Sequence, residues 1–414
     1  NPGNDFAESA DGSENAETPA ADGDDGYREY PTVVFERLRA AATTDRGGNP
    51  TWHRCEGEEG VRLAAVGDDF YGGRLGVATF CAALGATTGE ESHRTFTRRV
   101  ASPVADELDA DALAALDVGG ATGIGSLTYG FGLLGELLDA EEFEAAARRS
   151  AAALTPERFE SAGNDVTSGN AGAVLGLLGL YDRTGDDELL GRATAAGEQL
   201  LADRVEIDGV RVWRTAAADR VLTGMAHGVA GIAYALARLA DRTGEERFRT
   251  AAREALGYEE TAYSAARRNW RDDRPNVESA FTTGWCGGRS GIGLSRLGLY
   301  EETGDEAFLA DATRALAGTD PDRLDRFDHL CCGNSSRVEF LLRAGRTLDD
   351  DRHVEAARTI ASATVRRAHE EGRLRVPEGT DNWLDPSLFM GETGVGYTLL
   401  RLDAPDLPCV TLWK

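Results

Sequence analysis

Three cysteines carry the strongest chemical signal in this chain. Cys286 lies in the segment Trp-Cys-Gly-Gly, and Cys331 and Cys332 are adjacent in Leu-Cys-Cys-Gly-Asn. Thiolate sulfur is a preferred ligand of Zn²⁺, and three protein ligands leave the fourth tetrahedral position open. We therefore predict that these three residues hold a catalytic zinc ion. A substrate thiol bound there would lose its proton and become a nucleophile at neutral pH.

The alternative is that these sulfurs only fill space in the core, because free cysteine is among the most buried residue types. Three cysteines at equivalent places in neighbouring repeats, as described below, favour the metal site. A disulfide between Cys331 and Cys332 would be strained and is not expected in a reducing compartment. The other cysteines, Cys55, Cys81 and Cys409, match no ligand spacing, and we interpret them as packing or incidental residues.

Two further residues could move protons. His227 lies in Gly-Met-Ala-His-Gly-Val-Ala-Gly, and Asp165 lies four residues before the glycine of the preceding repeat. His227 could be a fourth metal ligand, a general acid or base, or a histidine that is satisfied in the core. Opposite a thiolate site we favour proton transfer. Asp165 could orient His227 or only cap a turn, and Asp69 has the equivalent place in the first repeat.

Three more polar residues near these turns are open to a functional or a structural interpretation. His329 lies two residues before Cys331, and its offset predicts that it points away from the turn. Arg289 and Arg337 could bind a substrate carboxylate or glutamyl group, although exposure to solvent is the simpler interpretation.

The turns that carry these residues recur along the chain. A Gly-x-x-Gly motif, followed by a helix of small and apolar residues, occurs seven times at intervals of 45 to 60 residues. Intervals of this size indicate a repeat architecture. In the sixth motif Ser336 replaces the second glycine. The motifs begin at Gly73, Gly120, Gly169, Gly228, Gly288, Gly333 and Gly391.

Each repeat is predicted to contain two helices. The first is apolar nearly all round, as in residues 173–180, and should be buried, whereas the second is amphipathic, as in residues 187–204. Alternating apolar and polar runs long enough for a sheet are missing, so the class is all-α. The apolar residues 407–413 at the end of the chain favour a closed ring over an open solenoid. We predict an α/α toroid of seven inner and seven outer helices, with the glycine turns at one rim.

Charge narrows the range of partners. The 414 residues carry 71 Asp and Glu against 44 Lys and Arg, a net charge of −27, and Lys414 is the only lysine. Such an acidic composition resembles that of proteins from salt-loving microbes, and it disfavours binding to nucleic acid or to anionic membranes. No stretch approaches the roughly 20 apolar residues of a membrane span. With no targeting signal at the start, the expected compartment is the cytoplasm.

The first residues differ in composition from the rest. Residues 1–28 are rich in Asp, Glu, Ala and Gly, and we predict a disordered acidic tail or linker, with the toroid formed by residues 29–414. The missing initiator methionine indicates a fragment of a longer chain.

Taken together, the turns resemble the lanthionine synthetase C-like cyclases, and more closely the C-terminal cyclase domain of class II lanthipeptide synthetases, the LanM type. The resemblance runs from about Tyr30 to the end. It rests on Gly-x-x-His-Gly-x-x-Gly at 224–231, Trp-Cys-x-Gly-x-x-Gly at 285–291, Leu-Cys-Cys-Gly-Asn at 330–334 and the terminal Asp-Leu-Pro-Cys-Val. Many members have Cys-His-Gly in the third motif, and Cys-Cys-Gly resembles the subgroup whose zinc is held by three cysteines.

The resemblance implies an α/α toroid with a catalytic zinc held by Cys286, Cys331 and Cys332, and with His227 and Asp165 in the active site. It favours Asp165 over the equivalent residue of the first repeat, because the family's aspartate lies one repeat before the histidine. The implied reaction is addition of a peptide cysteine to dehydroalanine or dehydrobutyrine. The implied partners are a dehydrated precursor peptide and a dehydratase, on an upstream domain or on another protein.

The sequence departs from the family's pattern at two positions, and it also allows two other functions. Gly287 stands where the family often has a polar or aromatic residue, and Thr282 stands where some relatives have arginine. A stand-alone enzyme that adds glutathione or another small thiol to dehydrated proteins would use the same zinc. In a non-catalytic peptide-binding toroid the zinc would be a structural clamp, with a side chain such as His227 in its fourth position.

Overall fold

The computed structural model describes residues 26–56, 62–215, 220–274, 279–377 and 384–414. The predicted acidic tail, residues 1–28, lies outside this part of the chain except for its last three residues. Those three form the 3₁₀ helix η1 (Gly26–Arg28), whose Tyr27 is buried and whose Arg28 contacts Asp403. The folded unit therefore starts at least three residues before the predicted boundary.

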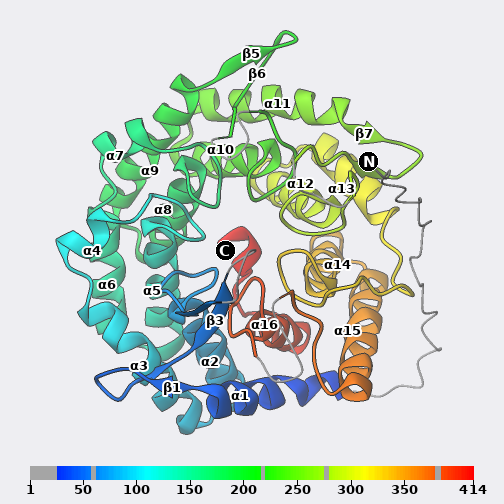
Figure 1. Ribbon diagram of the computed structural model, residues 1–414. Coiled ribbons are helices and arrows are strands. Elements are labelled where there is room, and N and C mark those ends of the chain that lie inside the picture. Colours follow the sequence, from blue (N-terminus) through cyan, green and yellow to red (C-terminus); the bar gives the residue numbers. More distant parts are fainter. Residues whose placement is uncertain (1–25, 57–61, 216–219, 275–278, 378–383) are drawn as a thin grey trace, which may run out of the picture.

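Within the described residues, seven inner helices form a closed ring (Figure 1). Each inner helix packs against the next, and the last packs against the first, which confirms the predicted α/α toroid. The inner helices are α2 (Arg74–Thr88), α5 (Ile124–Leu138), α8 (Asn170–Thr184), α10 (Val229–Thr243), α12 (Arg289–Thr303), α14 (Asn334–Leu348) and α16 (Glu392–Asp403).

Seven outer helices surround this ring, each against one inner helix. Six follow their inner partner in the chain, whereas α1 packs against α16, so the two ends of the folded unit complete the seventh pair. The outer helices are α1 (Tyr30–Ala41), α3 (Glu91–Asp106), α6 (Glu141–Ala152), α9 (Asp187–Ala202), α11 (Glu246–Thr261), α13 (Glu306–Leu316) and α15 (Asp351–Glu371).

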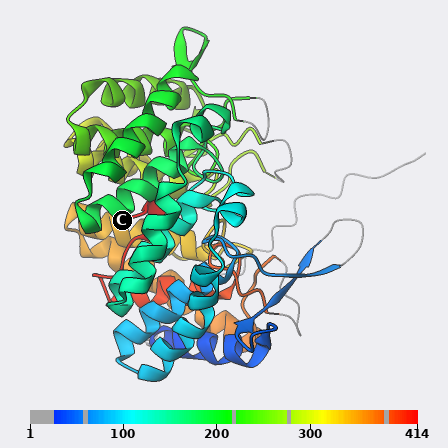
Figure 2. The ribbon, with the colours of Figure 1, turned by 90° about the vertical axis from the view of Figure 1, so that its left-hand side faces the viewer.

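The connections between repeats add short elements. Two are helices, α4 (Ala110–Ala114) and α7 (Pro156–Ser161), and four are two-stranded antiparallel hairpins. The β3–β4 hairpin extends from the side of the ring where many of the connecting loops gather (Figure 2). The hairpin pairs are β1 (Thr43–Thr44) with β2 (Pro50–Thr51), β3 (His53–Glu56) with β4 (Arg62–Ala65), β5 (Val205–Ile207) with β6 (Val210–Val212), and β7 (Tyr263–Ser264) with β8 (Asn269–Trp270).

Every inner helix begins after a glycine with an extended backbone, as the motif predicts. One predicted start is wrong. The second helix begins after Gly123 and not at Gly120, because the Gly-x-x-Gly pair there, Gly120 and Gly123, ends at the helix cap instead of starting from it. In the correct register Ser126 replaces the second glycine, as Ser336 does in the sixth repeat.

The second glycine of the motif allows the preceding turn to fold back onto the helix. A Cβ atom at Gly172 would lie 2.0 Å from the carbonyl oxygen of Val166 and 2.1 Å from the amide nitrogen of Gly120. The same contact, to the carbonyl three residues before the helix cap, recurs at Gly231 and Gly291, at 2.0 and 1.8 Å. Close approach of two backbones, and not an unusual φ angle, therefore requires glycine here.

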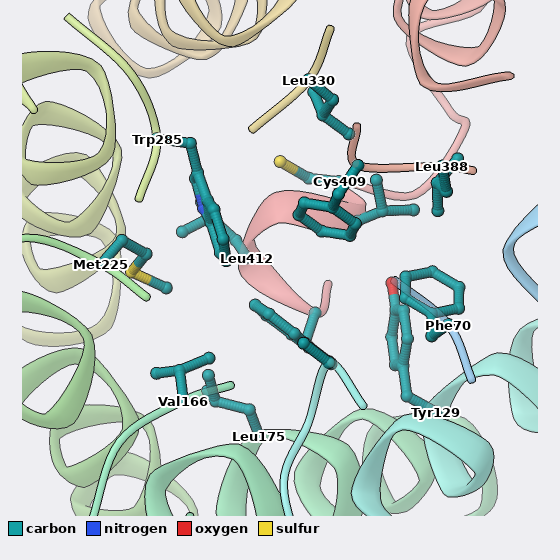
Figure 3. Close-up of a cluster of buried hydrophobic side chains, with 14 of the residues drawn as sticks. Phe70, Tyr129, Val166, Leu175, Met225, Trp285, Leu330, Leu388, Cys409 and Leu412 are labelled. Atoms are coloured by element: carbon teal, nitrogen blue, oxygen red, sulfur yellow. The ribbon is translucent and has the colours of Figure 1, made fainter. Parts of the chain in front are cut away.

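The C-terminal segment fills the centre of the inner ring. Residues around the 3₁₀ helix η2 (Val410–Leu412) pack against large side chains that the turns direct inward, among them Phe70, Met225 and Trp285 (Figure 3). The indole of Trp285 donates a hydrogen bond to the Thr411 carbonyl (3.1 Å). The apolar end of the chain is thus buried as predicted, and it closes the barrel below the rim.

These contacts predict opposite effects for two glycine substitutions. Gly172→Ala should lower the free energy of unfolding by about 1–3 kcal/mol, because the new methyl group overlaps backbone atoms that cannot move independently. Gly191→Ala, in the exposed middle of α9 with open space around it, should raise it by about 0.5–1 kcal/mol. Chemical denaturation of both variants checks this, and equal effects of the two would contradict the packing described for the turns.

Candidate metal centre

Backbone hydrogen bonds join the seven turns into a closed ring at the rim. In six of the seven links, the residue two positions before the helix cap donates its N–H to the carbonyl of its counterpart in the next turn. The link from the fifth turn to the sixth shifts by one residue, because Trp285 and not Cys286 donates to Cys331. The donor–acceptor pairs are Tyr71–Ala121, Ala121–Thr167, Thr167–Ala226, Ala226–Cys286, Trp285–Cys331, Cys331–Phe389 and Phe389–Tyr71, at 2.6 to 3.2 Å.

The three predicted ligands meet in this ring. The Sγ atoms of Cys286, Cys331 and Cys332 all lie within 4.8 Å of one another, and those of the adjacent pair are 3.4 Å apart. Four sulfurs around a tetrahedral zinc, at a Zn–S distance of about 2.3 Å, are separated by about 3.8 Å. The two turns approach closely because Gly284 has no side chain, and a Cβ atom there would lie 2.7 Å from Cys332 Cα. Donor type and spacing both fit a soft divalent ion.

The other candidate ligands lie elsewhere. Among the described residues, the cluster contains neither His329 nor Cys81 nor Cys409. The buried His329 ring has its Nδ1 next to the Phe389 carbonyl (3.2 Å) and the Cys332 amide (3.3 Å), so it contacts the cysteine turn, and the expectation that it points away from this turn is wrong. Cys81 and Cys409 are buried singly in the core, as predicted for packing residues. The side chain of Cys55 lies outside the described part of the chain.

In the metal-free protein the three thiols share negative charge unequally. Hydrogen bonds from Cys331 and Cys332 lower the pKa of the Cys286 thiol, and the positive charge of Arg274 lowers it further against the effect of burial. The pKa values of Cys331 and Cys332 are raised, chiefly by their hydrogen bonds to Cys286. Cys286 is therefore the first of the three to ionise.

His227 and Asp165 lie together one turn away from the sulfurs. Asp165 Oδ2 is 2.7 Å from His227 Nδ1, and Asp165 Oδ1 accepts the Ser168 amide (2.8 Å). Because an ionised carboxylate only accepts hydrogen bonds, we assign the imidazole proton to Nδ1, which leaves Nε2 as the acceptor. The amide of Ala226, next to His227, donates to the Cys286 carbonyl (3.0 Å). Asp69, the equivalent residue of the first repeat, accepts the Gly72 amide of its own turn at Oδ1 (2.7 Å).

Comparison with known protein families places this chain in one of them. The family model described as "Lanthionine synthetase C-like protein" matches residues 64–412. This chain belongs to the lanthionine synthetase C-like family. A search of curated protein sequences finds no match.

A solved structure shares the fold of this lanthionine synthetase C-like protein. Nisin cyclase superposes with a TM-score of 0.63 at 15% identity, over 94% of this chain and 96% of the other. An unsaturated glucuronyl hydrolase specific for heparin (TM-score 0.49, 15% identity, 92% and 96% covered) and a sugar epimerase from a ruminal bacterium (0.47, 12%, 92% and 98%) are also similar in outline. At 15% identity the likeness to nisin cyclase bears on the fold alone, and the other two, with TM-scores below 0.5, carry no argument.

This lanthionine synthetase C-like protein has a charged pair beside the cysteine sulfurs that the sequence analysis did not predict. Arg274 Nη2 lies 2.6 Å from Oδ2 of the buried Asp272, and its charge acts on Cys286 and Cys332. A Cβ atom at Gly287 would lie 2.5 Å from Asp272 Oδ2 and 2.9 Å from Arg274 Nη2. The pair thus occupies the space of a side chain at position 287, which explains why glycine stands there. Thr282, at the other departure, donates to Asp272 Oδ2 (3.3 Å).

A tyrosine also faces the sulfurs from the first repeat. The Tyr71 ring stacks on Phe389 with centroids 4.8 Å apart and an interplanar angle of 11°. Burial raises the pKa of Tyr71 well above its usual range, and the negative charge of the hydrogen-bonded Cys331 raises it further. Tyr71 occupies the same place in its turn as Cys286 and Cys331, so alignment of the seven turns could have found it.

Buried ion pairs hold the turns in place. Glu259 accepts the Gly224 amide (2.9 Å), at the start of the turn that carries His227, and pairs with Arg296 (2.5 Å). Asp328, just before the two adjacent cysteines, accepts from Asn334 (2.8 Å) and pairs with Arg367. These residues lie outside the motif, and only the folded chain brings them to it.

The two arginines that the sequence singled out have different surroundings. Arg337 is buried, and its guanidinium donates to the carbonyls of Arg323 (2.6 Å) and Asp320, so the expectation of a solvated side chain is wrong for it. Arg289, the first residue of α12, is partly buried.

Among the described helices none is both long and apolar enough to cross a membrane.

Arg274 predicts a change in thiol reactivity. In metal-free protein, Arg274→Gln should raise the pKa of the Cys286 thiol, because a nearby positive charge is lost and Asp272 is left unpaired. The pH profile of Cys286 alkylation by iodoacetamide, followed by peptide mapping, should then move to higher pH, because the thiolate is the reactive form. Arg271→Gln in the same loop, where Arg271 pairs with Asp273 (2.7 Å), is the control and should leave the profile unchanged. An unaltered profile for Arg274→Gln would contradict the assignment.

Proposed function

We propose that this protein is a zinc-dependent lanthipeptide cyclase, which forms lanthionine or methyllanthionine rings in a dehydrated precursor peptide. The observation that carries the proposal is the convergence of three sulfurs next to a His–Asp pair on one rim of the toroid. Membership of the lanthionine synthetase C-like family supports the same reaction. Cys286, Cys331 and Cys332 would hold Zn²⁺, which as a Lewis acid lowers the pKa of a peptide thiol.

The reaction requires one proton to move and no group to leave. The cysteine sulfur forms a bond to the β-carbon of dehydroalanine or dehydrobutyrine, and the electron pair of the double bond moves to the α-carbon as an enolate. His227 Nε2 accepts the thiol proton and returns one to the α-carbon, while Asp165 keeps the proton of the ring on Nδ1. The peptide mass is unchanged, because the thiol adds across the double bond.

Charge at the site favours a reactive sulfur. The three cysteines are an electron-rich donor set, and Arg274 places one positive charge beside them. In the proposal, the positive charge of Arg274 stabilises this anionic cluster of sulfurs in the folded protein. The Tyr71 hydroxyl is hydrogen-bonded to Cys331.

We further propose that the chain acts as the cyclase part of a bifunctional LanM-type synthetase in the cytoplasm, with a dehydratase domain or protein upstream. The Cys-Cys-Gly motif supports this assignment. The part of the chain that the structure describes contains only free cysteines, which fits a reducing compartment.

Addition of glutathione or another small thiol to a dehydrated protein is the second candidate, because the same residues would perform it. A zinc clamp with His227 as the fourth ligand is less favoured, since His227 is outside the sulfur cluster and its Nδ1 is engaged by Asp165. Incubation of a dehydrated cysteine-containing peptide with and without glutathione separates the candidates. Loss of free thiol at constant mass indicates cyclisation, and a mass increase equal to that of glutathione indicates the second reaction.

The first prediction from this proposal concerns the sulfur cluster. Cys286→Ala should lose stoichiometric zinc and should no longer consume the peptide thiol, because two sulfurs cannot complete the site. Cys81→Ala removes an equally buried thiol from the core of α2 and should retain both properties. Metal analysis and a free-thiol assay measure them. Ring formation by zinc-replete Cys286→Ala protein would refute the ligand assignment.

The second prediction concerns proton transfer. His227→Gln should reduce the rate of thiol loss by about 10²–10⁴-fold while the zinc content stays the same, because a general acid or base is removed and no ligand is lost. Asp165→Asn should reduce the rate by about 10–100-fold, because the imidazole loses the acceptor that fixes its tautomer. Asp69→Asn, at the equivalent turn position, is the matched control and should stay within a few-fold of the parent rate. Loss of zinc from His227→Gln would favour the clamp.

A further inference from the structure

A second polar site lies on the outer side of the cysteine turn. A cavity of about 190 Å³ opens where the connection between α13 and α14 passes the start of α12. Its lining includes Thr283, Arg289, Asp320, Arg323, Asp325 and Arg337. Thr283 and Arg289 flank Cys286 by three residues on either side, so the cavity lies beside the proposed metal centre.

Arg289 is the unusual member of this lining. Its Nε atom is buried and has no hydrogen-bond partner, and within the described part of the chain the structure shows no ion pair for its guanidinium. The group fits against the backbone of the connection, since a Cβ atom at Gly318 would lie 2.4 Å from Arg289 Nη1. A buried donor without an acceptor is costly, and native structures rarely leave one unpaired unless a water or ligand completes it.

The nearby charges do not compensate Arg289. Arg337 lies close enough for its positive charge, added to burial, to lower the pKa of Arg289, while the Asp325 carboxylate opposes both effects. That carboxylate is shared, because it also accepts the Thr283 hydroxyl (2.5 Å) and lies 3.9 Å from Arg337 Nε. The Asp320 carboxylate accepts an amide of its own loop, that of Asp322 (3.1 Å). Arg289 and Arg337 therefore share the Asp325 carboxylate, in a cavity that Asp320 and Arg323 also line.

The backbone amides in the first turn of α12 do not provide hydrogen-bond donors to a ligand in this cavity. Those of Arg289, Ser290 and Gly291 donate to carbonyls of the preceding turn at 3.2 to 3.3 Å. The helix contributes only the positive end of its dipole. Recognition of a ligand would rest on the planar guanidinium of Arg289, whose adjacent N–H groups match two oxygens of one anion.

We propose that this cavity binds a small oxyanion, a carboxylate or a phosphate, through the guanidinium of Arg289. In a chain with a net charge of −27 such a site must be local, because the overall field repels anions. If the proposed function holds, the position beside the cysteine turn suits an acidic side chain of the peptide whose cysteine reacts. A free phosphate ion would use the same contacts.

Direct titration of the zinc-loaded full chain tests the site without reference to ring formation. N-acetylglutamate, inorganic phosphate and chloride are titrated separately by calorimetry at constant ionic strength. We expect saturable binding of at least one of the two oxyanions and none of chloride. Preference for N-acetylglutamate indicates a peptide carboxylate as the natural ligand, and preference for phosphate indicates a phosphate source.

Variants assign that binding to the cavity. Arg289→Gln should weaken it by tenfold or more, and Arg289→Lys should weaken it less, because lysine keeps the charge but not the two-pronged geometry. Arg352→Gln makes the same charge change on the exposed surface of α15 and should bind as the parent does. Circular dichroism confirms that the variants are folded. Absence of saturable oxyanion binding to the parent, or equal binding by folded Arg289→Gln, overturns the proposal.

Discussion

The closed ring of backbone hydrogen bonds at the rim is the constraint on which the rest of this molecule depends. Each turn is held by its neighbours on both sides, so the position of any one side chain is set by all seven repeats. The link that shifts by one residue is the one that joins Trp285 to Cys331. At that place two turns approach within the reach of a single metal ion, and Gly284 makes the approach possible.

Side chains along each turn point alternately toward the centre of the barrel and toward its rim. The residue three positions before the helix cap points inward, where Phe70, Met225 and Trp285 pack on the C-terminal segment (Figure 3). The next residues face the rim, where Cys286 and His227 stand. Each short turn thereby supplies both the apolar side chains that pack in the centre of the barrel and the polar side chains at its rim. Packing of the apolar side chains holds the polar groups in fixed positions.

The fold and the sulfur cluster could be predicted because both are written in a repeated pattern. Equivalent positions in a repeat become neighbours once the ring closes, so Cys286 and Cys331 had to meet. Arg274 and Asp272 could not be predicted in this way, because they belong to a connection whose path no periodicity describes, and only Gly287 hinted that something fills its place. The start of the second inner helix was misplaced for a local reason, since Gly120 and Gly123 form the glycine pair there although Gly123, not Gly120, caps the helix.

The proposed function requires that three cysteine sulfurs bind the zinc ion and that its fourth coordination position is open to a substrate thiol. X-ray absorption at the zinc edge of the loaded protein tests this most directly. We expect three sulfur neighbours at about 2.3 Å and one nitrogen or oxygen neighbour, changing to four sulfurs when a thiol-containing dehydrated peptide is added. Two sulfurs with an imidazole, or a coordination shell that the thiol does not alter, would contradict it.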